Sequence, residues 1–303
     1  IATRDGVLTS TTATAAAALP KAGGTMTGNL ATAGISAVTA GTSNFVAGVN
    51  AGNSLASGSS NNTFVGDEAG IETTTPTYNT GVGKFSLEKN TTGETNTALG
   101  GSSLRNNTTG DNNVAVGYRT LIANTTADNN TAVGYYALTA NTTGANNVSV
   151  GANALQSNTT GDQNTALGDA ALAANTTATG NTAVGHASLN LNTTGAANTG
   201  TGFYSLLSNT TGADNTANGY MALRANTTGN YNTAIGDRAL RYNTTGANNT
   251  AVGYYSLLQN TTASENTAVG YNSLLANTTG PNNTAIGFGS ARANTTGTDN
   301  TAL

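Results

Sequence analysis

The residues of this chain that could carry chemistry are asparagines and aromatic residues repeated at a fixed spacing. The tripeptide Asn-Thr-Thr recurs every seventeen residues. It has the form of an N-glycosylation acceptor, which would carry sugar in a secreted eukaryotic or archaeal protein. The alternative is a ladder of polar turn residues, which explains Asn and Thr without sugar. The possible glycosylation sites are Asn90, Asn107, Asn124, Asn141, Asn158, Asn175, Asn192, Asn209, Asn226, Asn243, Asn260, Asn277 and Asn294.

Most aromatic residues occupy the two positions that follow a glycine recurring at the same spacing. These two positions vary most between copies, which indicates that they are exposed to solvent. Exposed rings along a rod can stack on sugars, with the phenol as a polar handle. Alternatively, they cover the coil surface or contact another chain. The possible glycan contacts are Tyr118, Tyr135, Tyr136, Phe203, Tyr204, Tyr220, Tyr254, Tyr255 and Tyr271.

The repetition argues against an enzyme, because a reaction centre requires one irregular place. No nucleophile, base and orienting group can be assembled, and the single histidine, His186, is predicted to lie on the surface. A phosphate loop at Lys84 fails because Tyr78 stands where its first glycine should be. Acidic residues lack calcium-loop spacing, and the chain has no cysteine. We therefore expect no catalytic residues, no metal site and no cofactor.

Composition narrows the class of protein further. Charged residues make up 8% of the 303 residues, the net charge is −4 and the pI is near 4.8, so nothing indicates nucleic-acid binding. No apolar run approaches membrane-spanning length, so we expect no membrane insertion. Large aliphatic residues are scarce, but the strict period predicts order through stacking of similar coils.

One glycine column never changes within the regular part of the chain, which predicts a positive φ or a backbone packed too closely for a Cβ. A second glycine, after Asn-Thr-Thr, is replaced by Ala127, Ala178 and Ala263 and is therefore less demanding. The fixed glycines are the predicted structural turns: Gly66, Gly83, Gly100, Gly117, Gly134, Gly151, Gly168, Gly185, Gly202, Gly219, Gly236, Gly253, Gly270 and Gly287.

The residues around the fixed glycine predict a short strand in each unit. An Asn stands four residues before it, followed by a Thr-Ala-Val pattern that places Thr and Val on one face and Ala on the other. A leucine four residues after the glycine marks the other wall of the coil. A helix is disfavoured because glycine and poor helix formers recur in every unit. We expect an all-β solenoid of seventeen-residue coils about 4.8 Å apart and about 65 Å long, with the Asn column bonded as a ladder.

The N-terminal part of the chain carries a resemblance to a known family. Residues 19–30 read Leu-Pro-Lys-Ala-Gly-Gly-Thr-Met-Thr-Gly-Asn-Leu, and Arg-Asp-Gly-Val-Leu-Thr-Ser precedes them at 4–10. This segment resembles one common in tail fibre proteins of tailed bacteriophages, where it precedes a trimeric shaft. The resemblance covers about thirty residues. It implies a virion protein whose partners are other tail or fibre proteins and a host-surface receptor or glycan.

The repeat itself carries a second resemblance. Its Asn-Thr-Ala-Val-Gly core is similar to the Asn-Ser-Val-Ala-Ile-Gly unit in the head domains of trimeric autotransporter adhesins, which are trimeric β-rolls. That family's repeat is shorter, and the Asn-Thr-Thr-Gly portion extends it here. Both resemblances imply a homotrimer, which would also hide part of each thin coil.

These observations predict a structural shaft with three parts. Residues 1–31 form a fibre segment, extended or as a short helix, 32–60 an irregular β transition or cap, and 61–303 the coil array, truncated at its C-terminus. We expect the shaft of a phage tail fibre that presents a receptor-binding tip and contacts host glycans. The alternatives are a cell-surface adhesin or self-assembling extracellular fibril, glycosylated or not, and, more remotely, an ice-binding solenoid.

Overall fold

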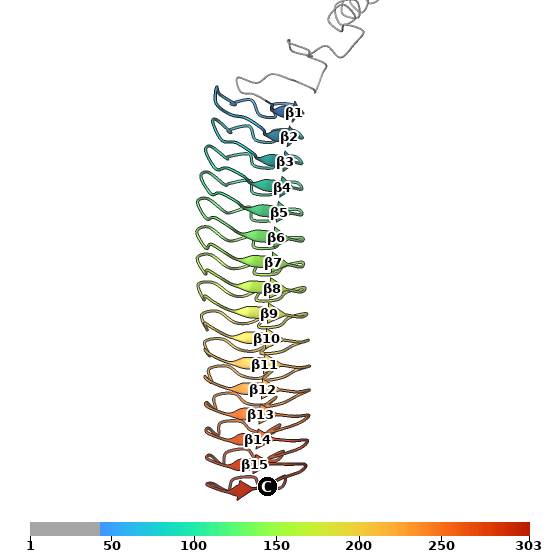
Figure 1. Cartoon of the computed structure of the whole chain (residues 1–303), viewed down its shortest axis with the longest axis vertical. Helices are drawn as coiled ribbons and strands as arrows, with labels where there is room; N and C mark the ends of the chain where they lie inside the picture. Colours follow the sequence, from blue (N-terminus) through green and yellow to red (C-terminus); the bar gives the residue numbers. More distant parts are fainter. Residues whose placement is uncertain (1–42) are drawn as a thin grey trace, which may run out of the picture.

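The computed structural model describes residues 43–303, which form one parallel β-solenoid (Figure 1). The predicted fibre segment 1–31, and the first part of the predicted transition, lie outside these residues. Sixteen short strands form one sheet in sequence order, and residues 43–303 contain no helix. The all-β solenoid with coils of about seventeen residues is therefore confirmed. The strands are β1 Phe45–Ala47, β2 Thr63–Val65, β3 Thr80–Val82, β4 Thr97–Leu99, β5 Val114–Val116, β6 Thr131–Val133, β7 Val148–Val150, β8 Thr165–Leu167, β9 Thr182–Val184, β10 Thr199–Thr201, β11 Thr216–Asn218, β12 Thr233–Ile235, β13 Thr250–Val252, β14 Thr267–Val269, β15 Thr284–Ile286 and β16 Thr301–Ala302.

The part of the predicted transition that the structure describes stacks on the coil array with an irregular step. Phe45 of β1 pairs with Thr63 of β2, a step of eighteen residues, whereas Thr63 pairs with Thr80 in the regular step of seventeen. The extra residue is accommodated outside the strands, because the pairing stays parallel and in register. With strands about 4.8 Å apart, the sixteen strands span about 70 Å.

Each strand presents its middle residue to the interior and its outer two residues to the outside. In β6, Ala132 is fully buried, whereas Thr131 and Val133 are half-buried. The same alternation holds along the sheet, because side chains of a strand point to opposite faces in turn. The interior side of the sheet is therefore lined with alanine, and threonine and valine face outward.

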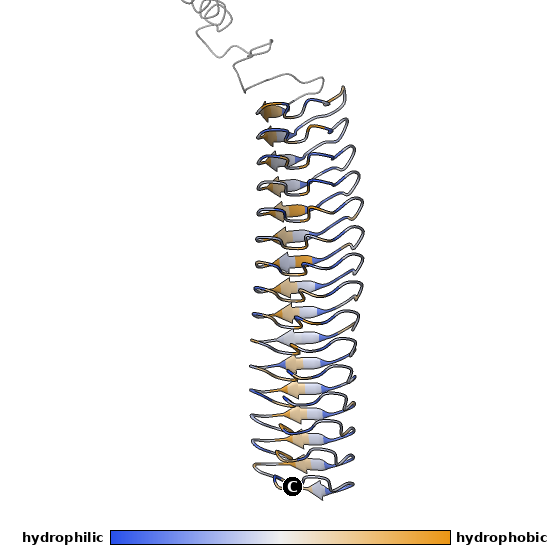
Figure 2. Cartoon of the chain, turned by 180° about the vertical axis from the view of Figure 1, so that it is seen from behind, coloured by the Kyte–Doolittle hydropathy of each residue, from blue (hydrophilic) through white to orange (hydrophobic). Residues whose placement is uncertain are grey.

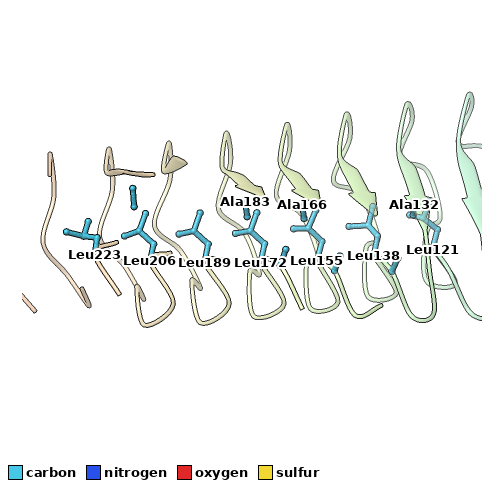
Figure 3. Close-up of a cluster of buried hydrophobic side chains, with 14 of the residues drawn as sticks. Leu121, Ala132, Leu138, Leu155, Ala166, Leu172, Ala183, Leu189, Leu206 and Leu223 are labelled. Carbon is cyan, nitrogen blue, oxygen red and sulfur yellow. The ribbon is translucent and has the colours of Figure 1, made fainter. Parts of the chain in front are cut away.

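The opposite wall of each coil supplies one leucine. Leucines such as Leu138, Leu155 and Leu172 are fully buried, and each points across a narrow interior toward the alanine of the strand (Figure 3). This wall is not a strand. Its backbone still bonds the next coil, since the amide of Leu155 donates to the carbonyl of Ala171 at 3.0 Å. Coil-to-coil hydrogen bonds therefore continue outside the sheet.

Two columns of asparagine fill the rest of the interior. We name the column four residues before the fixed glycine the first asparagine ladder, and the asparagines of Asn-Thr-Thr the second asparagine ladder. In the first ladder, Oδ1 of Asn147 accepts from the backbone amide of Asn164 at 2.9 Å, and its Nδ2 donates to the carbonyl of Gly161 at 2.9 Å. Both partners lie in the following coil, so each asparagine joins two coils.

The first prediction concerns the leucine column. Replacing Leu155 with Ala leaves a cavity that the rigid coils cannot close, and should lower the free energy of unfolding by about 2–5 kcal/mol. The matched control is Thr143→Ala in the same repeat unit, since Thr143 is exposed. Its cost should stay below about 1 kcal/mol. Denaturant unfolding followed by circular dichroism measures both, and equal losses would contradict the assignment of leucine as the core residue.

Candidate functional site

The fixed glycines lie at the corner that follows each strand and have φ between +121° and +140°. A Cβ at Gly151 would lie 2.4 Å from the carbonyl oxygen of Gly168 in the next coil. A side chain is therefore disfavoured at this position for two reasons, the positive φ and the close approach of the next coil. The corner aims the next two residues outward, so it positions the variable aromatic columns.

The Asn-Thr-Thr asparagines lie inside the coil. All of them up to Asn277 are buried, and Asn294 in the last coil is half-buried. Nδ2 of Asn158 donates to Oδ1 of Asn141 at 2.9 Å and to the carbonyl of Gly161 at 3.0 Å. The sequence predicts a polar turn at this tripeptide, whereas in the structure its asparagine is part of the interior.

The buried position of these asparagines argues against the hypothesis that they are glycosylated. A sugar on Nδ2 would need space that the next coil occupies, and it would remove a donor from the interior hydrogen bonds. The signal was present in the sequence: this asparagine is unchanged from Asn90 to Asn294, whereas the glycine three residues later is sometimes alanine.

The two threonines of the tripeptide have different environments. The first is half-buried, and its hydroxyl bonds the backbone of the next coil, as when Oγ1 of Thr159 donates to the carbonyl of Thr176 at 3.1 Å. The second, such as Thr160, is exposed. The tripeptide therefore contributes one interior residue, one edge residue and one surface residue to every coil.

The predicted aromatic positions are on the surface, in two adjacent columns. The outer column contains Tyr118 and Tyr135, which are 48% and 55% exposed, and the inner column contains half-buried rings such as Tyr136 and Tyr204. The inner column has positive φ, as at Tyr136 with φ of 55°, which turns the chain back toward the interior.

Rings in the outer column stack on one another along the rod. Three groups form: Tyr118 with Tyr135, then His186 with Phe203 and Tyr220, and finally Tyr254 with Tyr271 and Phe288. Ring centroids are 5.1–6.0 Å apart in these groups and the planes differ by 5–29°. Phe203 and Tyr271, the middle rings of the two groups of three, have a stacked neighbour on both faces, so a sugar can reach mainly their edges. Each end ring has one stacked neighbour only.

The inner column brings guanidinium groups to these rings. Nη1 of Arg119 donates to the hydroxyl of Tyr136 at 3.0 Å, and this hydrogen bond raises the pKa of Arg119. Desolvation, followed by the neighbouring phenol of Tyr136, raises the pKa of Tyr135. A hydrogen bond with Tyr255 likewise raises the pKa of Tyr254. Because the ordinary value for tyrosine is about 10, both phenols stay neutral at neutral pH.

His186 belongs to the surface, where the sequence placed it. Its Nδ1 lies 3.3 Å from Oδ2 of Asp169, and its ring stacks on Phe203 at 5.2 Å. Within residues 43–303 no three His, Cys, Asp or Glu side chains come together as a metal site. Among the described residues there is also no helix long and apolar enough to cross a membrane.

No protein-family model matches the chain, and the chain matches no curated protein.

The second prediction tests the fixed glycine against the replaceable one. Gly151→Ala forces alanine into a φ of +139° and a contact with the next coil, and should cost at least about 2 kcal/mol of unfolding free energy. Gly144→Ala in the same coil is the matched control. Its φ lies outside the positive range that strains alanine, and its column already contains alanine at Ala127 and Ala178. A Cβ at Gly144 would also lie 2.4 Å from the carbonyl oxygen of Gly161, so the difference between the two variants measures the cost of φ and not of space. Thermal unfolding of the two variants measures the difference, and an equal cost would contradict the distinction.

The third prediction tests the second asparagine ladder. Asn158→Asp loses both Nδ2 hydrogen bonds and places a carboxylate against carbonyl oxygens, so it should destabilise the coil by roughly 3 kcal/mol or more at pH 8. Burial raises the pKa of this aspartate above its unfolded value of about 3.9. The loss should therefore shrink as the pH falls toward about 3.5, where the protonated acid is again a donor.

The matched control for that variant is Asn153→Asp, which changes the charge equally in the half-buried inner column. Its stability should stay close to that of the unchanged chain at both pH values, as measured by urea unfolding. A loss for Asn158→Asp that does not depend on pH would contradict the interior hydrogen-bonding role.

Proposed function

We propose that this protein is a non-enzymatic structural rod, the shaft of a phage tail fibre, assembled as a homotrimer that holds a receptor-binding tip away from the virion. The observation that carries the proposal is an uninterrupted stack of sixteen parallel strands with a constant interior. A stack of this kind resists bending because every coil is hydrogen-bonded to the next along its whole perimeter. The tail-fibre resemblance of residues 19–30 supports the virion assignment.

Self-association is supported by an apolar strip on the outer face of the sheet. The residue before each fixed glycine points outward and is Val, Leu or Ile in most coils, as at Val150, Leu167 and Ile235, which are 37%, 38% and 42% exposed. We call this column the aliphatic stripe. Figure 2 shows it as the hydrophobic arrowhead ends of most strands.

The size of this face suits a protein–protein contact. The aliphatic stripe and the neighbouring threonine column form a flat strip about 10 Å wide and about 70 Å long, on the order of 700 Å². A standard interface covers roughly 800 Å² on each partner, and a monomer seldom exposes an apolar patch of several hundred Å². Identical chains aligned side by side would cover the stripe along its full length.

The fibre assignment is tested by antibody labelling of particles. Antibodies against residues 43–303, viewed by negative-stain electron microscopy on virions of the source, should label fibres attached to the tail. Label on the cell surface of the host, with none on virions, would favour the adhesin or fibril alternative. The interior position of the second asparagine ladder counts against the glycosylated form of that fibril.

The fourth prediction tests the aliphatic stripe. The unchanged chain should sediment with three times the mass of one chain, and Val150→Lys with Leu167→Lys should shift it to the monomer, because like charges would meet in the contact. The matched control is Thr143→Lys with Thr160→Lys, which adds the same charge in the exposed column of the same coils. The control should stay trimeric in analytical ultracentrifugation.

If the unchanged chain sediments as a monomer, the proposal of a homotrimer is contradicted. A trimer disrupted equally by both double variants would place the contact elsewhere on the coil. Circular dichroism confirms that the coils remain folded in each case.

A further inference from the structure

Three arginines lie close together in one short stretch of the rod. Three of the ten Lys and Arg residues of the chain, Arg224, Arg238 and Arg241, fall within two adjacent coils. Arg224 and Arg241 hold equivalent positions one coil apart, about 4.8 Å along the axis. We name these arginines and their contacting rings the Arg–Tyr cluster; its rings are Tyr204, Tyr220, Tyr242 and Tyr255.

The protein leaves most of this charge unpaired. Arg238 Nη1 lies 3.8 Å from Oδ1 of Asp237, which is too far for a hydrogen bond. Arg224 and Arg241 take part in no ion pair within residues 43–303, whereas Arg105, in the same column, pairs with Glu88. The Nε atoms of the three clustered arginines have no hydrogen-bond acceptor.

Aromatic rings hold these guanidinium groups in place. Arg238 lies 5.3 Å from the ring centroid of Tyr220, Arg224 lies 5.9 Å from that of Tyr204, and Arg241 lies 4.9 Å from that of Tyr242. A cation held over a ring loses less freedom when it binds an anion. The like charges are therefore arranged in advance of any partner.

Tyr242 differs from the stacked tyrosines. It is 38% exposed, and its column neighbours are Ala225 and Gln259, so no ring lies above or below it in the column. Among the described residues its ring pairs with the guanidinium of Arg241 and with no other ring. One face of Tyr242 is consequently free of any stacked ring and can receive a sugar, whereas Phe203 and Tyr271 have rings on both faces.

We propose that the Arg–Tyr cluster binds an acidic glycan, with a sugar ring stacked on Tyr242 and its carboxylate held by Arg241 and Arg224. Guanidinium groups bind carboxylates with paired, charge-assisted hydrogen bonds. Because the Nε atoms of Arg224 and Arg241 are buried, the carboxylate would bind their outer Nη atoms. A polynucleotide is disfavoured because the chain has a net charge of −4, and in the other group of basic residues Lys84 and Arg105 are paired with Asp67 and Glu88. This site does not depend on the tail-fibre assignment.

The test measures binding of the full chain to polygalacturonate, a linear carboxylated glycan, by isothermal titration calorimetry at fixed salt. Dextran serves as the neutral glycan, inorganic phosphate as the simple anion and single-stranded DNA as the polynucleotide. We expect binding to polygalacturonate and none to dextran. Arg224→Gln with Arg241→Gln should weaken it at least about tenfold, the loss expected for charge-assisted hydrogen bonds.

The matched control is Arg105→Gln with Arg292→Gln, which removes the same charge from the same column in distant coils. It should change affinity less than about twofold. Tyr242→Ala should weaken polygalacturonate binding, whereas Tyr231→Ala, an exposed tyrosine in another column, should not. Circular dichroism verifies folding of every variant.

Four results would overturn the proposal. The first is no binding of polygalacturonate by the unchanged chain. The second is an equal loss of affinity in both double arginine variants, which would indicate non-specific attraction, and the third is tighter binding of DNA than of the glycan. The fourth is phosphate binding that is as strong as polygalacturonate binding and unaffected by Tyr242→Ala. The last would identify an anion site with no sugar recognition.

Discussion

Satisfying buried amides across neighbouring coils is the constraint on which the rest of this structure depends. The carbonyl of Gly110 accepts one hydrogen bond from Asn96 of the preceding coil, at 2.8 Å, and one from Asn107 of its own coil, at 2.9 Å. The two asparagine ladders therefore meet at one backbone atom in most coils. Removing one coil would leave its neighbours with buried, unpaired amides, which are costly. Regular stacking follows from this requirement, since every coil must offer the same groups at the same height.

The same requirement explains an unusual backbone. In a single coil Asn146, Asn153 and Leu155 have φ of 60°, 55° and 49°. Asparagine tolerates this left-handed conformation, but leucine pays about 1–2 kcal/mol. The leucine column keeps it in coil after coil because it turns the side chain into the interior and directs the amide to the next coil. Coil shape is thus determined by the neighbouring coils more than by local preference.

Periodicity was sufficient to predict the solenoid, the strand in each unit and the two faces of that strand. Periodicity did not predict which face of the strand points to the interior, because alanine on one face and valine on the other are both apolar. The interior is narrow, so it takes alanine from the sheet and leucine from the opposite wall, and valine is left outside. The burial of the second asparagine ladder was missed because Asn-Thr-Thr-Gly also reads as a surface turn. Ring stacking could have been predicted, since a seventeen-residue step places equivalent rings about 4.8 Å apart.

Charged residues on the rod separate into those that the fold uses and those that it does not. Glu94, Asp111 and Asp128 lie in one outward column, where like charges repel, but Oδ1 of Asp111 accepts from the amide of Glu94 at 2.7 Å. Oδ1 of Asp128 accepts from the amide of Asp111 at the same distance. Each aspartate thus bonds a backbone group that would otherwise lack a protein partner. Arg224 and Arg241 have no such structural use, although they also stand one coil apart and repel each other. The unpaired charges of Arg224 and Arg241, with the ring of Tyr242 beside them, therefore favour binding of an anionic partner from outside the chain.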